Sequence, residues 1–443
     1  METYDPGISS KGTQAMLYEH AAAASRPVTA TVVRSAQELM NALEMPGAVD
    51  LHIDGMLDEV PTVRLRPGQM LRAAGAGAGL RFLPGQDGVR LSRDNALVGL
   101  ALLADPARRA VFNDDQLPNM GRVSLSGLRV SGQVQIVARG TLRAGHVDVD
   151  GLDIEAADTR ARSERPQGYG VEVLQGAFTL WNQQADTSSV VSAQLKGLSA
   201  GRAGAPVSGG GILVSGSGFE GGRVVVTTLE TGAVYSHGLI EPGTADRISG
   251  AVFTAHGAYV GVVRNRGAVV TYGANDMVLD NWGTVNEWIA EAPLTSYGSS
   301  AIGVVNFGTL HALEVRAPIE TFGHGARGFN VYEGKLGRAL FDRITTHGDG
   351  AVGVQIWQPV QRLVVRRGIE TKGGTGPSLV KGRMTTLSAT GLSIRPGGVV
   401  AEVDIGGGLL ARGPGMAPLE LLGQAGAFRV SGGLVGGAFE AAA

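Results

Sequence analysis

The chain has 443 residues, and 69 of them are glycine, about twice the usual share. Its 38 Lys and Arg residues nearly balance 40 Asp and Glu residues, so no broad basic face for nucleic acid is expected. It contains no cysteine, which excludes disulfides, thiolate catalysis and cysteine-based zinc sites. Length alone predicts about three domains, but a solenoid grows in one dimension and can reach this length as one domain.

Residues 1–30 are expected to form an N-terminal arm without strong periodicity. Met1 to Lys11 is polar, and the apolar run Ala21 to Ala24 is too short for the core of a secretory signal. No stretch reaches the roughly 18 apolar residues of a membrane span. A cytoplasmic location is therefore expected for the chain as written, or export if a leader was removed.

Residues 31–47 are predicted to form a short capping helix. Its start is a capping box, Ser35 to Glu38, in which the serine and glutamate side chains satisfy free backbone N–H groups. From Val49 onward the apolar residues alternate with period two, which predicts strands. We therefore expect one helix followed by a single β domain over residues 48–443.

A tripeptide that recurs every 25 residues organises the second half of the chain. Its copies are Thr271-Tyr272-Gly273, Ser296-Tyr297-Gly298, Thr321-Phe322-Gly323, Thr346-His347-Gly348 and Thr371-Lys372-Gly373. A fixed period of this length, with short β-branched runs and frequent glycine, predicts stacked β-coils rather than a helical repeat. The crossover rule for parallel strands predicts a right-handed coil.

The alternation of side chains along a strand predicts which residues of each copy face the core. The first residue of each tripeptide should form an inward ladder of hydroxyl groups. The middle residues should form an outward column of Tyr272, Tyr297, Phe322, His347 and Lys372. Because stacked coils lie about 4.8 Å apart, this column should be a continuous stripe on the surface.

Amide side chains recur near the predicted corners of the coils, at offsets that slip by one residue. They are Asn281, Asn306, Asn330 and Gln355. Such amides commonly stack into hydrogen-bonded ladders, so a structural role is predicted for them. Two less regular segments, residues 156–167 and 201–222, are predicted to be surface loops.

The short helix followed at once by strands resembles the N-terminal cap of right-handed parallel β-helix proteins. The segment Val33 to Leu43 has the pattern Val-x-Ser-x-x-Glu-Leu-x-x-Ala-Leu that is common in the pectate-lyase-like superfamily. The segment Asp94 to Leu102 resembles the early coils of those proteins. The resemblance implies an all-β, right-handed parallel β-helix, a fold that most often hosts carbohydrate-active enzymes.

Two glutamates in identical Ile-Glu-Thr contexts stand beside the outward column. Glu320 and Glu370 should lie two coils apart, roughly 9.6 Å, at the upper edge of the roughly 6.5–9.5 Å expected for an inverting glycosidase. With His347 on the coil between them, they are the candidate catalytic residues of a glycoside hydrolase. The candidate substrate-binding residues are Tyr272, Tyr297, Phe322, His324, Asp349 and Lys372. If His347 or Lys372 instead removes a proton next to a uronate carboxylate, the enzyme is a polysaccharide lyase.

The same stripe supports a second interpretation, because exposed aromatic residues at this density also suit a contact between subunits. The chain would then be a non-catalytic β-helix for binding, adhesion or scaffolding, and the glutamates would be ordinary solvated residues. A homo-oligomer is expected in either case, with a trimer as the candidate state. Carbohydrate is the expected partner, and no cofactor or metal is predicted.

Overall fold

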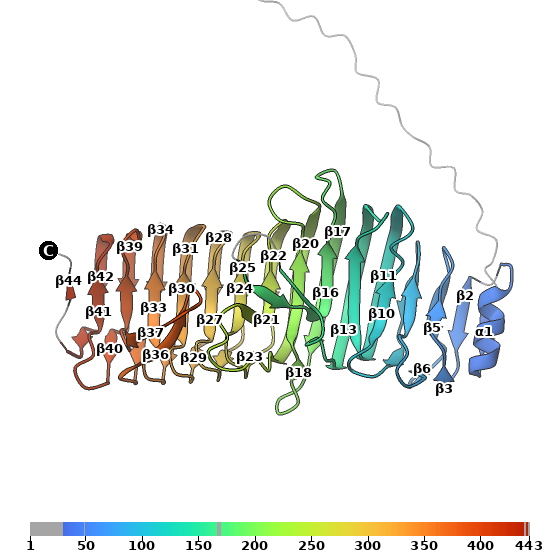
Figure 1. Cartoon of the computed structure of the whole chain (residues 1–443), viewed down its shortest axis with the longest axis horizontal. Helices are drawn as coiled ribbons and strands as arrows, with labels where there is room; N and C mark the ends of the chain where they lie inside the picture. Colours follow the sequence, from blue (N-terminus) through green and yellow to red (C-terminus); the bar gives the residue numbers. More distant parts are fainter. Residues whose placement is uncertain (1–29, 48, 166–169, 438–439, 442–443) are drawn as a thin grey trace, which may run out of the picture.

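The computed structural model describes residues 30–47, 49–165, 170–437 and 440–441. Over these residues the chain is a parallel β-solenoid, whose coils stack in sequence order along one long axis (Figure 1). The predicted all-β fold with one N-terminal helix is therefore confirmed. The predicted arm lies outside the described residues except for Ala30.

The N-terminal end of the solenoid is closed by α1 (Ala36–Glu44), which buries Leu39 against the first coils. Ser35 caps the helix as predicted, since its side chain accepts a 3.1 Å hydrogen bond from the backbone N–H of Glu38. The Glu38 side chain accepts a 2.7 Å hydrogen bond from the backbone N–H of Arg34, one residue before the position expected for a capping box. The helix is shorter than the predicted segment, because the preceding residues form β1 (Thr31–Val33), which pairs with the next strand of the solenoid. No helix among the described residues is long and apolar enough to span a membrane.

Each regular coil has three strands, which stack into three faces. The strands of the first face are β1 with β2 (Asp50–Ile53), β5 (Met70–Ala73), β8 (Ala96–Val98), β22 (Ala258–Asn265), β25 (Thr284–Ala290), β28 (Thr309–Val315), β31 (Lys335–Phe341), β34 (Val360–Val365), β39 (Val399–Ile405) and β42 (Gln424–Val430). The strands of the second face are β3 (Met56–Val60), β6 (Gly79–Phe82), β9 (Ala101–Leu103), β18 (Val207–Ser208), β23 (Val269–Thr271), β26 (Leu294–Ser296), β29 (Ile319–Thr321), β32 (Ile344–Thr346), β35 (Ile369–Thr371), β40 (Leu409–Ala411) and β43 (Leu434–Val435). Four long strands run through both faces: β11 (Asn119–Ser131), β13 (Ala144–Ala156), β17 (Val190–Ala200) and β20 (Arg223–His237).

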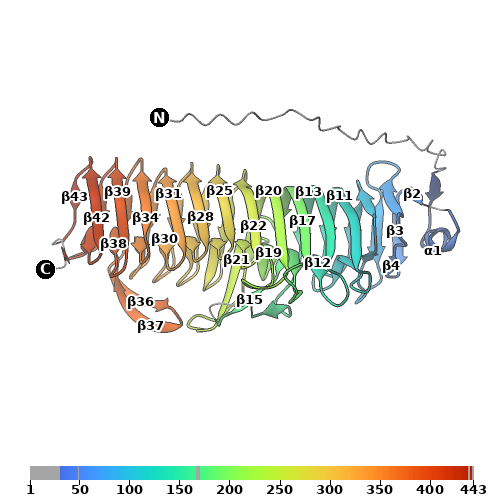
Figure 2. The same cartoon turned by 90° about the horizontal axis from the view of Figure 1, so that it is seen from above.

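The third face forms a separate sheet and carries the features that matter for function. Its strands are β4 (Val63–Arg64), β7 (Val89–Leu91), β10 (Arg109–Asn113), β12 (Gln133–Ala138), β16 (Gly176–Asn182), β19 (Gly210–Ser215), β21 (Arg247–Thr254), β24 (Asp276–Asn281), β27 (Ile302–Asn306), β30 (Arg327–Val331), β33 (Val352–Ile356), β38 (Leu392–Ile394), β41 (Leu419–Leu421) and β44 (Glu440–Ala441). Two insertions project from the solenoid on this side (Figure 2). One contains β14 (Ser163–Glu164) and β15 (Glu172–Leu174), and the other is the hairpin of β36 (Thr375–Val380) and β37 (Arg383–Ser388).

One apolar core runs through the coils from Val33 to Leu419. The predicted inward hydroxyl ladder is part of the buried interior: Thr271, Ser296, Thr321, Thr346 and Thr371 are all fully buried and in register. The glycine of the tripeptide is required by the stacking. A Cβ on Gly298 would lie 1.7 Å from the carbonyl oxygen of Gly273 in the preceding coil.

The corner amides form hydrogen-bonded pairs in two neighbouring columns. Asn281 donates to the side chain of Asn306 at 2.8 Å, and Asn330 donates to Gln355 at 3.3 Å. The strand register aligns Asn306 with Val331, so the one-residue slip moves the second pair to a neighbouring column.

The predicted loop at residues 201–222 is wrong for much of its length, because it contains β18 and β19 of the solenoid. Its glycines serve close stacking rather than chain flexibility. A Cβ on Gly211 would lie 2.3 Å from the carbonyl oxygen of Ala251 in the next coil. The first predicted insertion overlaps the segment that contains β14, above the third face.

Candidate functional site

The predicted outward column exists, and it begins one coil earlier than the sequence suggested. We call it the outer ladder: His237, Tyr272, Tyr297, Phe322 and His347. Successive ring centroids are 6.4, 5.4, 5.0 and 4.3 Å apart, and successive ring planes differ by 22, 10, 13 and 17°. The rings therefore cover one another's faces and turn their edges to solvent. A sugar approaching the ladder would meet ring edges rather than the faces on which its C–H groups stack.

The two candidate catalytic glutamates lie in different electrostatic environments. The register places Glu320 and Glu370 on either side of Thr345, two coils apart as expected. Glu370 accepts hydrogen bonds from Arg343 at 2.8 Å and from Arg412 at 3.0 Å. Burial acts to raise the pKa of Glu370, but the hydrogen bonds from Arg412 and Arg343 hold that pKa below its usual value. A general acid needs a raised pKa, so this environment disfavours Glu370 in that role.

The other candidate residues of the stripe are surface residues near its edge. Glu320 Oε1 lies 3.7 Å from His347 Nε2, which makes this pair the closest contact among the predicted catalytic groups. Lys372 continues the column by one coil and is exposed. His324 and Asp349 are exposed at the adjacent corner, where Asp349 Oδ1 accepts a 2.7 Å hydrogen bond from the backbone N–H of Gly374. Their predicted roles in substrate binding stay predictions.

The third face carries a cleft that the sequence analysis did not predict. Its volume is about 430 Å³, and it lies over β21, β24, β27 and β30 between the two insertions. The floor is largely apolar and includes Ile248, Met277, Ile302 and Phe307, and the insertions add Val171 and Leu379. The polar residues of the lining are Asp246, Asn275, Asp280, Ser300, Arg327, Glu333 and Lys381.

A second aromatic column borders this cleft. It consists of Trp282, Phe307, Tyr332 and Trp357. Successive ring centroids are 5.7, 5.1 and 6.5 Å apart. Trp282 and Phe307 also line an adjacent hollow of about 330 Å³ with Phe219 and His256. The sequence carries a signal for this column, because these residues recur with the same 25-residue period, directly after β24, β27, β30 and β33.

Two ionisable groups of the cleft have no partner of opposite charge among the residues that the structure describes. Burial raises the pKa of Asp280 well above its usual value, and a hydrogen bond from Trp282 offsets this only in part. Arg327 is fully buried, and its Nη1 donates to the carbonyl oxygens of Gly325 at 3.1 Å and Leu379 at 3.3 Å. Its Nε and Nη2 have no hydrogen-bond partner within the part of the chain that the structure describes.

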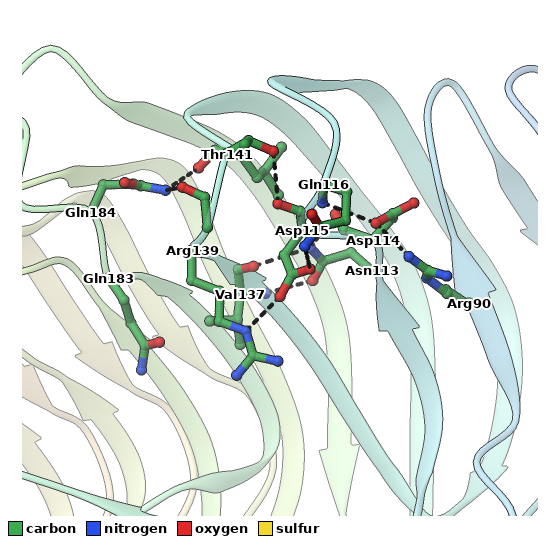
Figure 3. A network of polar contacts seen from close by, with 12 residues as sticks. Arg90, Asn113, Asp114, Asp115, Gln116, Val137, Arg139, Thr141, Gln183 and Gln184 are labelled. Atoms are coloured by element: carbon green, nitrogen blue, oxygen red, sulfur yellow. Dashed lines mark hydrogen bonds and ion pairs between the residues drawn. The ribbon is translucent and has the colours of Figure 1, made fainter.

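A polar hollow of about 190 Å³ lies on the same face, on the N-terminal side of the cleft. Arg139 Nε donates to Asp115 Oδ2 at 2.8 Å, and the guanidinium of Arg109 binds the Asp87 carboxylate (Figure 3 shows the Asp115 contacts). Asn113 bridges the backbone of Val137 in both directions, at 2.7 and 3.0 Å. The arginines of this hollow are thus engaged by side chains of the protein, including Arg162, which donates to Gln133.

The described residues contain no group of three His, Cys, Asp or Glu side chains that could hold a metal ion. Comparison with family models, with curated proteins and with solved structures finds no match to the chain. Support for the parallel β-solenoid and for the site therefore comes from the structure alone.

Proposed function

We propose that the protein is a non-catalytic binding protein whose cleft takes a small ligand with a largely apolar body. The observation that carries this proposal is the cleft itself, about 430 Å³ between two insertions on an otherwise regular sheet. Ligand sites typically measure roughly 300–1,000 Å³ and have mostly apolar walls with a few polar groups. Both insertions pack outside the continuous core, so the closure of the coils does not account for them.

The hairpin of β36 and β37 forms the roof of the cleft. Specific contacts hold it in place, which favours a pre-formed site. The backbone N–H of Leu379 donates to the Ser300 hydroxyl at 2.9 Å, and the Ser378 hydroxyl donates to the Gly325 carbonyl at 2.9 Å. Gly325 has a φ of +62°, and a Cβ there would lie 2.5 Å from the carbonyl oxygen of Pro377. A glycine at position 325 thus allows the hairpin to pack closely against the sheet. A ligand would lose little binding energy to ordering this wall.

The test is the binding of N-phenyl-1-naphthylamine, a neutral apolar dye that becomes fluorescent when it leaves water. Met277 is partly exposed on the cleft floor, and Met277→Trp should fill the cleft and weaken dye binding by at least about tenfold. Val225→Trp is the matched control, because Val225 is 39 % exposed on a first-face segment of β20, away from the cleft. Equal dye affinity of the two variants would show that the cleft is not the binding site.

A second candidate function is a carbohydrate-active enzyme of the pectate-lyase-like superfamily, acting along the outer ladder. The observation that favours it is the 3.7 Å contact between Glu320 and His347 on an exposed stripe. Neutral and acidic polysaccharides should be screened with wild type, Glu320→Gln and Glu370→Gln. New reducing ends indicate a hydrolase, and an unsaturated product that absorbs in the ultraviolet indicates a lyase. Activity that survives in both variants would remove them as a catalytic pair.

Self-association through the outer ladder is compatible with either function. Tyr297 and Phe322 are 49 % and 37 % exposed, so their ring edges are open to a partner copy. Analytical ultracentrifugation of wild type and of the double variant Tyr297→Ser, Phe322→Ser measures this directly. A monomeric wild type at micromolar concentration would contradict an interface at the ladder.

A further inference from the structure

A buried arginine without a counter-charge stands in the wall of the cleft. Arg327 is 0 % exposed, and it forms no ion pair with any carboxylate among the described residues. Removing a guanidinium from water is costly unless an anion or a full set of hydrogen bonds replaces the lost hydration. The two carbonyl oxygens that accept from Nη1 satisfy only one side of the group.

The geometry of the unsatisfied donors is specific. Nε and Nη2 are neighbours on one edge of the planar guanidinium, and both lack a hydrogen-bond partner among the described residues. This edge binds a carboxylate, sulfate or phosphate by two parallel N–H···O hydrogen bonds. The opposite side, at Nη1, is held between the sheet and the hairpin by Gly325 and Leu379. The free edge is therefore fixed in orientation.

The acidic residues of the cleft do not supply the missing charge. Glu333 pairs with Lys381 at 3.1 Å, and Asp246 pairs with Arg165 at 3.1 Å. The carboxyl group of Asp280 is fully buried, and its burial favours the neutral form. The charge of Arg327 is thus left for a group from outside the chain.

We propose that Arg327 is an anion subsite, and that the ligand of the cleft carries one carboxylate, sulfate or phosphate group on an apolar body. This inference rests on the proposed binding function of the cleft. The apolar body would contact the floor at Met277 and Ile302, and the anionic group would reach the free edge of Arg327 beside Ser300.

A pair of dyes that differ in one charged group tests the assignment. The probe 8-anilinonaphthalene-1-sulfonate has the apolar body of N-phenyl-1-naphthylamine and adds a sulfonate. Wild type should bind the sulfonate dye at least about tenfold more tightly than Arg327→Met does, because the variant replaces the cation with an apolar side chain. The neutral dye should bind both proteins with similar affinity. Arg338→Met is the matched control, since Arg338 is exposed on the first face and should leave both affinities unchanged.

Competition on the wild type gives a readout that does not depend on the folding of a variant. Octanoate, octyl sulfate and octyl phosphate should displace the sulfonate dye at concentrations about tenfold below that of octanol. Their order identifies which anionic group the subsite prefers. Equal displacement by octanol and the three anions would overturn the anion subsite and leave an apolar cleft.

The failure of the subsite and the failure of the cleft have different signatures. If Arg327→Met binds the sulfonate dye as wild type does, while Met277→Trp blocks both dyes, only the anion assignment is wrong. If Met277→Trp blocks neither dye, the cleft is not a binding site and both proposals fall. Arg327→Lys, which keeps the charge without the two-pronged edge, should retain part of the preference for the sulfonate dye.

Discussion

The cleft and the polar hollow lie on the same sheet face, but they differ in how their arginines are paired with carboxylates. In the hollow, Arg139 is paired with Asp115 and Arg109 with Asp87, while Arg162 donates to the side-chain oxygen of Gln133. In the cleft, Arg327 has no carboxylate partner among the described residues, and none of their cations offsets the burial of Asp280. The carboxyl groups differ accordingly: hydrogen bonds from Gln116 and Arg139 lower the pKa of Asp115, whereas burial raises that of Asp280. Ion pairs within the chain thus neutralise Arg109 and Arg139, and the contrast with Arg327 supports the proposed anion subsite.

The largest effect is expected from breaking a pair in the hollow. Asp87→Ala leaves Arg109 without its carboxylate and removes the 2.9 Å hydrogen bond that Asp87 accepts from the Arg109 backbone N–H. We expect the free energy of unfolding at pH 7 to fall by about 2–3 kcal/mol, because a half-buried cation is left uncompensated. Urea unfolding followed by circular dichroism measures the change.

The control for this loss is Asp150→Ala. Asp150 is exposed on β13 and forms no ion pair within the described part of the chain, so its replacement should cost less than about 0.5 kcal/mol. If Asp87→Ala and Asp150→Ala unfold at the same urea concentration, the ion pair of Asp87 and Arg109 does not stabilise the fold. The proposed difference between hollow and cleft would then be wrong.

The second effect has the opposite sign and concerns Asp280. Because burial raises the pKa of Asp280 in the folded state, its contribution to stability is complete below about pH 4 and is lost as the pH rises through the folded-state pKa. Asp280→Asn cannot titrate. We therefore expect this variant to be more stable than wild type at pH 8, on the order of 2 kcal/mol, and to lose that advantage at pH 4.

Thermal unfolding of wild type and Asp280→Asn across this pH range provides the measurement. Asp87→Asn should behave in the reverse manner, since hydrogen bonds from Arg109 outweigh the effect of burial and lower the pKa of Asp87. Its stability deficit should be present at pH 7 and shrink as the pH falls below about 4. Parallel pH profiles for the two variants would contradict the proposed difference between cleft and hollow.

The sequence predicted the solenoid because its signals are local and periodic. The 25-residue tripeptide sets the stacking of β23, β26, β29, β32 and β35, and the alternation within each strand assigns the inward hydroxyls. The capping box identified the helix for the same reason, since Ser35 and Glu38 act within one turn.

The site depends on relations that a single sequence does not display. Ile369 and Leu409 are paired in the structure but lie 40 residues apart (409 − 369), which leaves 15 residues beyond the period for the hairpin of β36 and β37. That irregularity was visible, but it did not reveal which face the hairpin covers. The free edge of Arg327 is harder still to predict, because no sequence pattern shows which N–H donors stay without an acceptor among the described residues once the chain has folded.

The smallest effect is expected at the mouth of the cleft. Lys381 Nζ lies 3.1 Å from Glu333 Oε1 and 5.7 and 5.5 Å from the ring centres of Tyr332 and Trp357. Both charged groups are well exposed, so Lys381→Met should lower the free energy of unfolding by less than about 1 kcal/mol. Unlike the pair in the hollow, this one should act locally. Hydrogen exchange should accelerate in β36 and β37 and stay unchanged in β10 and β12.

Lys381→Asn separates the role of the charge from that of the turn. Lys381 has a φ of +48° at the tip of the hairpin, a left-handed conformation that Asn adopts more easily than Lys or Met. If the charge of Lys381 holds the hairpin against the sheet, amide hydrogens of the hairpin should exchange faster in both variants than in wild type. The effect should be smaller for Lys381→Asn, because Asn adopts the left-handed conformation of this turn with less strain. If Asn exchanges more slowly than wild type, the ion pair contributes nothing to closure and the backbone of the turn alone holds the roof over the cleft.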